Sequence, residues 1–142
     1  MTATLAFKQQ SDLDPALIDS ATRSISAEAL VGRWLNTNPL TRGIAEIAIA
    51  RDGERLILGI NAVGQGEPIR WPPTPAQALA NLEEEAGQRV IALSAIFDFG
   101  FMKSETYLRV NKGVLVIVLF NSFTDESRRA NYVTREFFYR PV

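Results

Sequence analysis

The feature that most constrains this chain is a series of segments, from residue 43 onward, in which apolar side chains recur at every second position. Residues 43–51 and 54–62 both show this alternation, and Asp52-Gly53 between them is a typical tight-turn dipeptide. A period of two is that of a β-strand with one buried face, and Asp-Gly favours the short turns of hairpins. The sequence therefore predicts a β-hairpin at this point.

Further strand-like segments follow, separated by turn-forming residues such as Gly100 and Asn111-Lys112-Gly113. Strands that follow one another through short turns are typical of an up-and-down antiparallel sheet, and eight strands suit a small closed barrel. We therefore predict a mainly β fold, a single up-and-down antiparallel eight-stranded β-barrel. Its strands are expected at Gly32-Arg33-Trp34 and at residues 43–51, 54–62, 68–71, 90–99, 101–110, 114–123 and 131–140.

The triplet Gly32-Arg33-Trp34 stands where the barrel begins. A closed barrel needs a bulky side chain at its narrow end, and a glycine in a strand often marks the close approach of another backbone. We therefore expect Trp34 to fill the barrel floor and Gly32 to allow such an approach.

Two helices are expected beside the strands. Asp14-Pro15 offers a capping residue followed by proline at the first helical position, and apolar residues follow it at helical spacing. Thr74, Pro75 and Gln77 form a capping box, which predicts an inserted helix over residues 75–86. The chain is thus divided into residues 1–29, an N-terminal lead and short helix that packs on the barrel, and residues 30–142, the barrel domain.

Composition excludes several classes of protein. The chain has 142 residues, 46% of them hydrophobic, and a formal net charge of −1. That length and content suit one domain with its own core, and the balanced charge argues against nucleic acid and anionic membranes as partners. No apolar run is long enough for a signal peptide or a membrane span, so we expect a cytoplasmic protein.

Cysteine and histidine are both absent. Their absence excludes disulfides and thiolate chemistry, and it removes the commonest metal ligand and general base. No acidic segment has the spacing of a calcium loop. We therefore expect neither a metal site nor a cofactor.

A Gly-x-Trp triplet on a first strand, followed by up-and-down hairpins and an arginine on the closing strand, resembles the calycin group of lipocalins, avidins and fatty-acid-binding proteins. In that group the tryptophan lies across the barrel floor and an arginine of the last strand packs over it. The resemblance implies this part for Arg135 or Arg140. The inserted helix and the lack of disulfides depart from the group, so the resemblance implies the barrel and not the ligand.

The closing strand offers the most informative polar residue. Because side chains alternate along a strand, an Arg135 that faces the lumen brings Phe137 and Tyr139 with it and leaves Glu136, Phe138 and Arg140 outside. Two interpretations of Arg135 stay open. Either it is a structural plug over Trp34, or it is a hook for an anionic ligand.

Aromatic residues supply the remaining candidates for ligand binding. Most apolar residues at alternating spacing are simple core, and a minority line a cavity. The ligand-binding set that we predict is Trp34, Trp71, Phe97, Phe101, Tyr107, Phe120, Arg135, Phe137 and Tyr139.

Residues 114–120 are apolar on both faces. An ordinary barrel strand has a wet outer face, so something is expected to cover this one. The N-terminal helix, the inserted helix and a second copy of the chain are the three options, and we favour a homodimer.

Two functions remain open. The first is a barrel that binds one small apolar molecule, which carries an anionic end if Arg135 is a hook. The alternative is a cofactor-independent cyclase or isomerase that folds a hydrophobic biosynthetic intermediate inside the barrel. Its catalytic candidates are Glu105, Tyr107 and Asp98, and the first two act as acid–base groups only if their face of the strand points inward.

Overall fold

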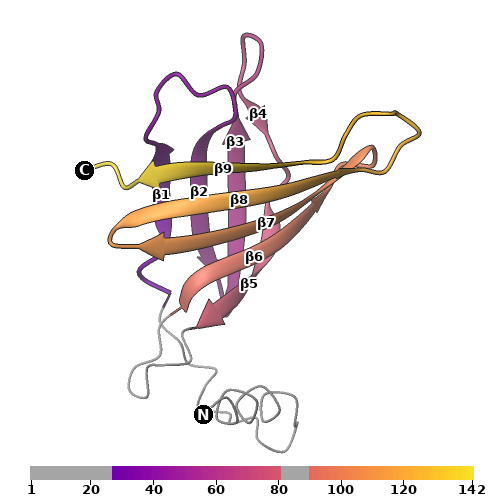
Figure 1. Cartoon of the computed structure of the whole chain (residues 1–142). Coiled ribbons are helices and arrows are strands. Elements are labelled where there is room, and N and C mark those ends of the chain that lie inside the picture. The colour runs from indigo at the N-terminus through magenta and orange to yellow at the C-terminus, as the bar shows by residue number, and fades with distance from the viewer. Residues whose placement is uncertain (1–26, 81–89) are drawn as a thin grey trace, which may run out of the picture.

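The computed structural model describes residues 27–80 and 90–142 of the chain, and all regular elements in these ranges are β-strands (Figure 1). The strands are β1 (Gly32–Asn36), β2 (Ile44–Asp52), β3 (Arg55–Ala62), β4 (Ile69–Arg70), β5 (Thr74–Ala80), β6 (Val90–Asp98), β7 (Met102–Asn111), β8 (Val114–Phe123) and β9 (Tyr132–Tyr139).

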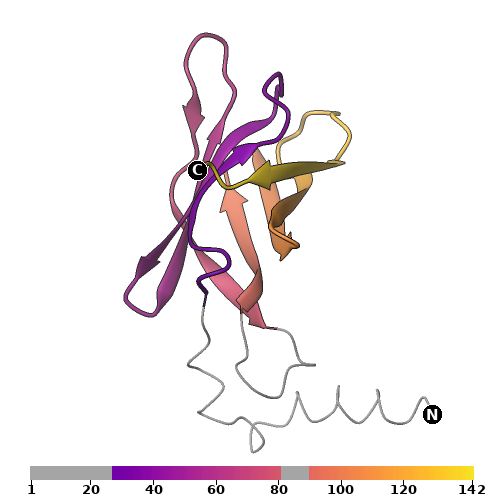
Figure 2. The same cartoon turned by 90° about the vertical axis from the view of Figure 1, so that its left-hand side faces the viewer.

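Eight of these strands close into one antiparallel barrel. Strands β5 to β9 pair in chain order, β9 pairs with β1, β1 with β2, β2 with β3, and β3 with β5. The β9–β1 contact is short and joins Leu35 to Tyr139 and Asn36 to Phe138. Strand β4 pairs only with the end of β3, outside this ring. Figure 2 shows the strands as two crossing layers, with β1, β2 and β3 on one side and β6 to β9 on the other.

The barrel interior is apolar because each strand directs its alternate residues inward. Along β8, for example, Leu115, Ile117 and Leu119 are buried, whereas Val114 and Phe120 are exposed. The predicted mainly β barrel with eight up-and-down strands is thus confirmed.

Trp34 fills one end of the barrel, as predicted. Its side chain is 1% exposed, and its indole nitrogen donates a hydrogen bond to the carbonyl of Leu30 at 2.9 Å. The Arg140 guanidinium lies 4.7 Å from the centre of the indole ring. Of the two arginines that the calycin resemblance offered for this position, Arg140 occupies it, and the interpretation of Arg135 as the plug over Trp34 is wrong.

Gly32 has a different role from the one expected. A β-carbon at this position would meet no atom within 4 Å, so no backbone approaches closely. Its φ of 132° lies where L-residues other than glycine are rarely found, so the bend into β1 requires glycine.

The inserted helix predicted over residues 75–86 is wrong where the structure describes it, because residues 74–80 form strand β5. Pairing with two neighbours explains the difference: Ala76 pairs with Leu56 of β3, and Ala78 pairs with Leu93 of β6. Without β5 the sheet would stay open between β3 and β6. The predicted number of eight barrel strands is right, but one member differs. The segment predicted at residues 68–71 contains only the short strand β4, which lies outside the barrel, and β5 takes its place in the barrel wall.

The predicted N-terminal lead and helix fall almost entirely outside the described residues, so the helix and the division at residue 29 stay predictions. Within the described part of the chain, no element covers the outer face of β8, and Phe120 there is 51% exposed. Because residues 74–80 belong to the barrel wall, they do not form the expected helical cover. The homodimer stays a prediction.

Candidate functional site

A cavity of about 490 Å³ lies at the end of the barrel opposite Trp34. Strands β2, β3, β7, β8 and β9 contribute its wall, together with Trp71 from the segment between β4 and β5. The lining residues are Arg42, Gly43, Ile44, Ala62, Trp71, Met102, Leu119, Asn121, Tyr132, Thr134, Arg135 and Glu136.

Cross-strand pairing places the lining residues of β8 and β9 side by side. Leu119 pairs with Thr134, and Asn121 pairs with Tyr132. Because alternate residues of a strand share a face, all four side chains belong to the inner face of the barrel. This face combines an apolar floor at Leu119 with polar groups toward the mouth.

Glu136 is held firmly at the edge of the cavity. Its carboxylate accepts hydrogen bonds from Asn36 Nδ2 at 2.9 Å, from Thr41 Oγ1 at 2.6 Å and from the backbone N–H of Ile44 at 3.0 Å. Hydrogen bonds to a charged acceptor are stronger than neutral ones. Glu136 therefore ties β9 to β1 and to the loop before β2.

Gly43 makes room for this carboxylate. A β-carbon at position 43 would lie 2.5 Å from Oε2 of Glu136. The loop before β2 therefore needs glycine here because the carboxylate occupies the space that a side chain would fill.

Among the residues that the structure describes, three polar side chains are buried in the barrel. Thr106 is satisfied, since its hydroxyl donates to the carbonyl of Ala95 at 2.8 Å. Ser104 and Asn121 face each other across β7 and β8, yet Ser104 Oγ and Asn121 Oδ1 are both buried without a hydrogen-bond partner. Most buried polar atoms in folded proteins are paired, so these two oxygens are exceptions. Of the two residues, Asn121 lines the cavity and Ser104 does not.

The opposite wall is aromatic. The Trp71 ring packs edge-on against Phe97 and Phe99, with ring centres 5.0 and 4.9 Å apart. Edge-to-face contacts of this kind add to the stabilisation from burial alone. Trp71 is thus a rigid apolar surface on one side of the cavity.

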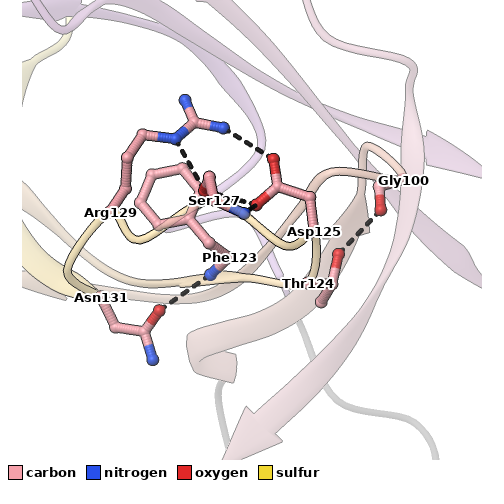
Figure 3. Close-up of polar contacts among 7 residues, drawn as sticks. All are labelled: Gly100, Phe123, Thr124, Asp125, Ser127, Arg129 and Asn131. Atoms are coloured by element: carbon pink, nitrogen blue, oxygen red, sulfur yellow. Dashed lines mark hydrogen bonds and ion pairs between the residues drawn. The ribbon is translucent and has the colours of Figure 1, made fainter.

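The loop between β8 and β9 ends directly before Tyr132, which lines the cavity, and a polar network orders it (Figure 3). Thr124 Oγ1 donates to the carbonyl of Gly100 at 2.7 Å, and Arg129 donates to Asp125 at 2.9 Å. The Arg129 guanidinium also stacks 4.1 Å from the centre of the Phe123 ring.

Asp125 is the charged centre of that network. Hydrogen bonds from the Ser127 side chain and backbone, followed by those from Arg129, hold the pKa of this carboxyl below its ordinary value. The ionised carboxylate is therefore the form that fits the ordered loop.

The predicted register of β9 is wrong. Phe138 is fully buried and pairs with Leu115 and Asn36, whereas Phe137 and Tyr139 are 40% and 45% exposed. Glu136 and Phe138 therefore face inward, and Arg135 lies on the outer face beside the ring of Phe137. Arg135 still contributes to the rim of the cavity, so its part in binding an anion stays a prediction.

The catalytic candidates do not meet in this cavity. Glu105 and Tyr107 lie on the outer face of β7, where they line a groove of about 600 Å³ together with Phe120 of β8. Asp98 is the exposed last residue of β6 and accepts a hydrogen bond from the backbone N–H of Gly100 at 2.9 Å. The acid–base role predicted for Glu105 and Tyr107 required their face of the strand to point into the barrel, and this face points outward.

The other predicted ligand-binding residues are dispersed. Trp34 closes the far end, Phe97 is core beneath Trp71, and Phe101 is an exposed turn residue next to Arg129. Of the predicted set, only Trp71 and Arg135 line the cavity. Sequence reasoning missed Asn121, whose polar side chain at an inward position of an apolar strand was the available signal.

No family model matches the chain, and neither a curated protein nor a solved structure was found to match it. The calycin resemblance is thus supported by the closed eight-stranded architecture alone. In residues 27–80 and 90–142, no group of three or more acidic side chains is placed to hold a metal ion. The described part of the chain contains no helix long and apolar enough to cross a membrane.

Proposed function

We propose that this protein binds one small, largely apolar molecule in the cavity at the open end of the barrel. The observation that carries the proposal is the cavity itself, about 490 Å³ in volume, at the end opposite the Trp34 plug. Pockets for small molecules typically measure about 300–1,000 Å³ and combine apolar walls with a few polar groups.

The lining supplies both kinds of contact. Trp71, Met102 and Leu119 offer apolar surface, and Trp71 is already fixed by two aromatic neighbours. A wall that is rigid before binding loses little conformational freedom when the ligand enters. Asn121 and Thr134 supply polar contacts that orient the ligand.

Binding is better supported than catalysis. A cyclase or isomerase needs a group that moves a proton at the substrate. Glu105, Tyr107 and Asp98 lie outside the cavity, and the carboxylate of Glu136 at its edge already accepts hydrogen bonds from three donors. A cyclase that acts through shape alone remains the alternative.

A pair of cavity-filling variants tests the site with N-phenyl-1-naphthylamine, a neutral fluorescent probe. Ala62 lines the cavity, so Ala62→Trp places an indole in the space meant for the ligand. Gln77 lines the outer groove instead, so Gln77→Trp is the matched control. We expect Ala62→Trp to weaken probe binding by at least about tenfold, equivalent to about 1.4 kcal/mol, and Gln77→Trp to leave it unchanged.

Equal binding by wild type and Ala62→Trp, with folding verified by circular dichroism, would overturn this assignment. Loss of binding in Gln77→Trp alone would move the site to the outer groove. Native mass spectrometry of the full chain purified from its own cells would identify a retained ligand and would report the oligomeric state in the same measurement.

A further inference from the structure

The outer face of strands β7, β8 and β9 carries a continuous apolar patch. Phe120 and Val133 pair across β8 and β9 and are each more than half exposed, and Val116 pairs in the same way with Phe137. The members of this outer patch are Tyr107, Val116, Val118, Phe120, Val133 and Phe137. An antiparallel sheet that faces water normally has a polar outer face, so a patch of this kind marks an interaction surface.

Two opposite charges lie within the outer patch. Glu105 and Arg109 are exposed on the outer face of β7, one on each side of Tyr107. Four residues of a strand separate their Cα atoms by about 13 Å, and their side chains stand out from the sheet, so the two charges do not meet within one chain. In residues 27–80 and 90–142, neither of them has an ion pair or a hydrogen bond.

Two-fold symmetry brings these charges together. In a symmetric dimer both copies use the same surface, so each contact occurs twice. When β7 of one copy lies against β7 of the other in the opposite direction, with Tyr107 at the axis, Glu105 of each copy faces Arg109 of the other. We propose that the protein is a homodimer that forms in this way through the outer patch.

The apolar residues match in the same arrangement. Phe120 and Val116 pair across β7 and β8 with the two charged residues, so Phe120 of one copy faces Val116 of the other. By the pairing of β8 with β9, Val133 in turn faces Phe137. A large side chain thus meets a small one at each point. Two sheets that pack face to face keep their strands within about 30° of each other, which suits this register.

A groove beside β7 gives the second copy a place to enter. It measures about 600 Å³, and Ser94, Ile96, Glu105 and Tyr107 belong to its lining, whereas Arg109 does not. In the dimer the Arg109 side chain of the second copy reaches Glu105 through this groove. Its apolar stem lies along Ile96 while its guanidinium meets the carboxylate.

The other symmetric arrangement of these strands matches less well. A two-fold axis parallel to β8 would set β7 against β9, so Glu105 would face Val133 and lose water without gaining a partner. The proposed arrangement brings the two Arg135 side chains toward each other only at the margin of the patch. There Arg135 is exposed and lies beside the ring of Phe137, so solvent screens the two charges.

An exchange of the two charges tests the contact, with sedimentation velocity of the full chain as the measurement. We expect wild type to be mainly dimeric at about 10 µM. Glu105→Arg and Arg109→Glu should each raise the dimer dissociation constant at least about tenfold, because each places like charges together twice. The double variant with both changes should regain the wild-type affinity. Since the two residues do not meet within one chain, this rescue can arise only between copies.

Arg135→Gln is the matched control, because it removes a charge from the same face outside the proposed ion pairs, and it should leave the dimer intact or tighten it. Circular dichroism verifies the folding of each variant. The inference does not rest on the binding function, because the outer patch lies outside the cavity. Glu105→Arg should therefore bind N-phenyl-1-naphthylamine as wild type does.

Each of the remaining outcomes would overturn the proposal. A wild type that stays monomeric at about 100 µM would remove the dimer. If Phe120→Glu also lowers the melting temperature of that monomer, a segment of the same chain covers the patch. Loss of the dimer in both single variants without rescue in the double variant would exclude the pairing of Glu105 with Arg109. Weakening by Arg135→Gln and not by Arg109→Glu would set β7 against β9.

Discussion

The Arg140 guanidinium lies 4.7 Å from the centre of the Trp34 ring, and it donates hydrogen bonds to the backbone carbonyls of Glu28 and Ala29 at 2.8 and 2.6 Å. The residue directly after the last strand, β9, thus joins the turn before the first strand across the floor of the barrel. This contact supports the ring closure where the β9–β1 pairing is short.

Arg140→Met should therefore lower the free energy of unfolding by about 1–2 kcal/mol, because it removes a cation–π contact and charge-assisted hydrogen bonds. Arg135→Met, on the strand β9 that Arg140 directly follows, is the matched control, and its effect should stay within about 0.5 kcal/mol because Arg135 is exposed. Urea unfolding followed by circular dichroism measures both. Equal losses of stability in the two variants would mean that the contacts of Arg140 do not stabilise the closure of the barrel between β9 and β1.

Gly43→Ala should destabilise the protein by about 1–3 kcal/mol, because the new β-carbon displaces a carboxylate that three donors hold in place. Gly59→Ala is the control, since a β-carbon there would meet Ala48 only at ordinary contact distances of 3.7 and 3.9 Å. Urea unfolding followed by circular dichroism measures the stability of both variants. If Gly43→Ala is as stable as Gly59→Ala, then Glu136 does not depend on its three donors.

Gln77→Thr distinguishes the strand from the helix for residues 74–80. Gln77 is exposed on β5, where threonine is favoured over glutamine, so the variant should be as stable as wild type or more stable by about 0.5 kcal/mol. Gln77→Ala, which favours a helix, should be less stable than Gln77→Thr. The reverse order in thermal melts would support a helix at this position.

Asp125 should titrate below the ordinary aspartate range. The Ser127 hydroxyl contributes most to this lowered pKa, so Ser127→Ala should raise it toward the ordinary value, and Arg129→Gln should raise it less. Chemical-shift titration of the Asp125 carboxyl carbon measures all three proteins. An unchanged pKa in Ser127→Ala would show that the loop does not hold the carboxylate as described.

The sign of the accompanying stability change follows from the same shift. Because the pKa is lower in the folded than in the unfolded chain, ionised Asp125 stabilises the loop at pH values above the unfolded pKa. That contribution disappears as the pH falls through the folded pKa. The effect is small because the group is exposed to solvent, and it should appear as acid-induced loosening of the loop between β8 and β9.

The interior of the candidate site was the hardest part to predict. Alternation along residues 131–140 shows which side chains share a face, but not which of the two faces is buried. Both faces carry aromatic residues, and Glu136 looks like a solvent-facing charge until its three donors are known. The face of Glu136 and Phe138 is the buried one because Phe138 pairs with the inward-facing Leu115 and because the loop before β2 supplies donors to Glu136.

Local pattern alone determined the mainly β class, the hairpin at Asp52-Gly53 and the tryptophan floor, because strand periodicity, turn chemistry and the bulk of Trp34 act over a few residues. Only the tertiary structure decided that residues 74–80 are a strand, since the open edges of β3 and β6 outweigh a local helix signal. It also decided that Ser104 and Asn121 meet without a partner, because cross-strand neighbours seventeen positions apart depend on the register of the whole barrel.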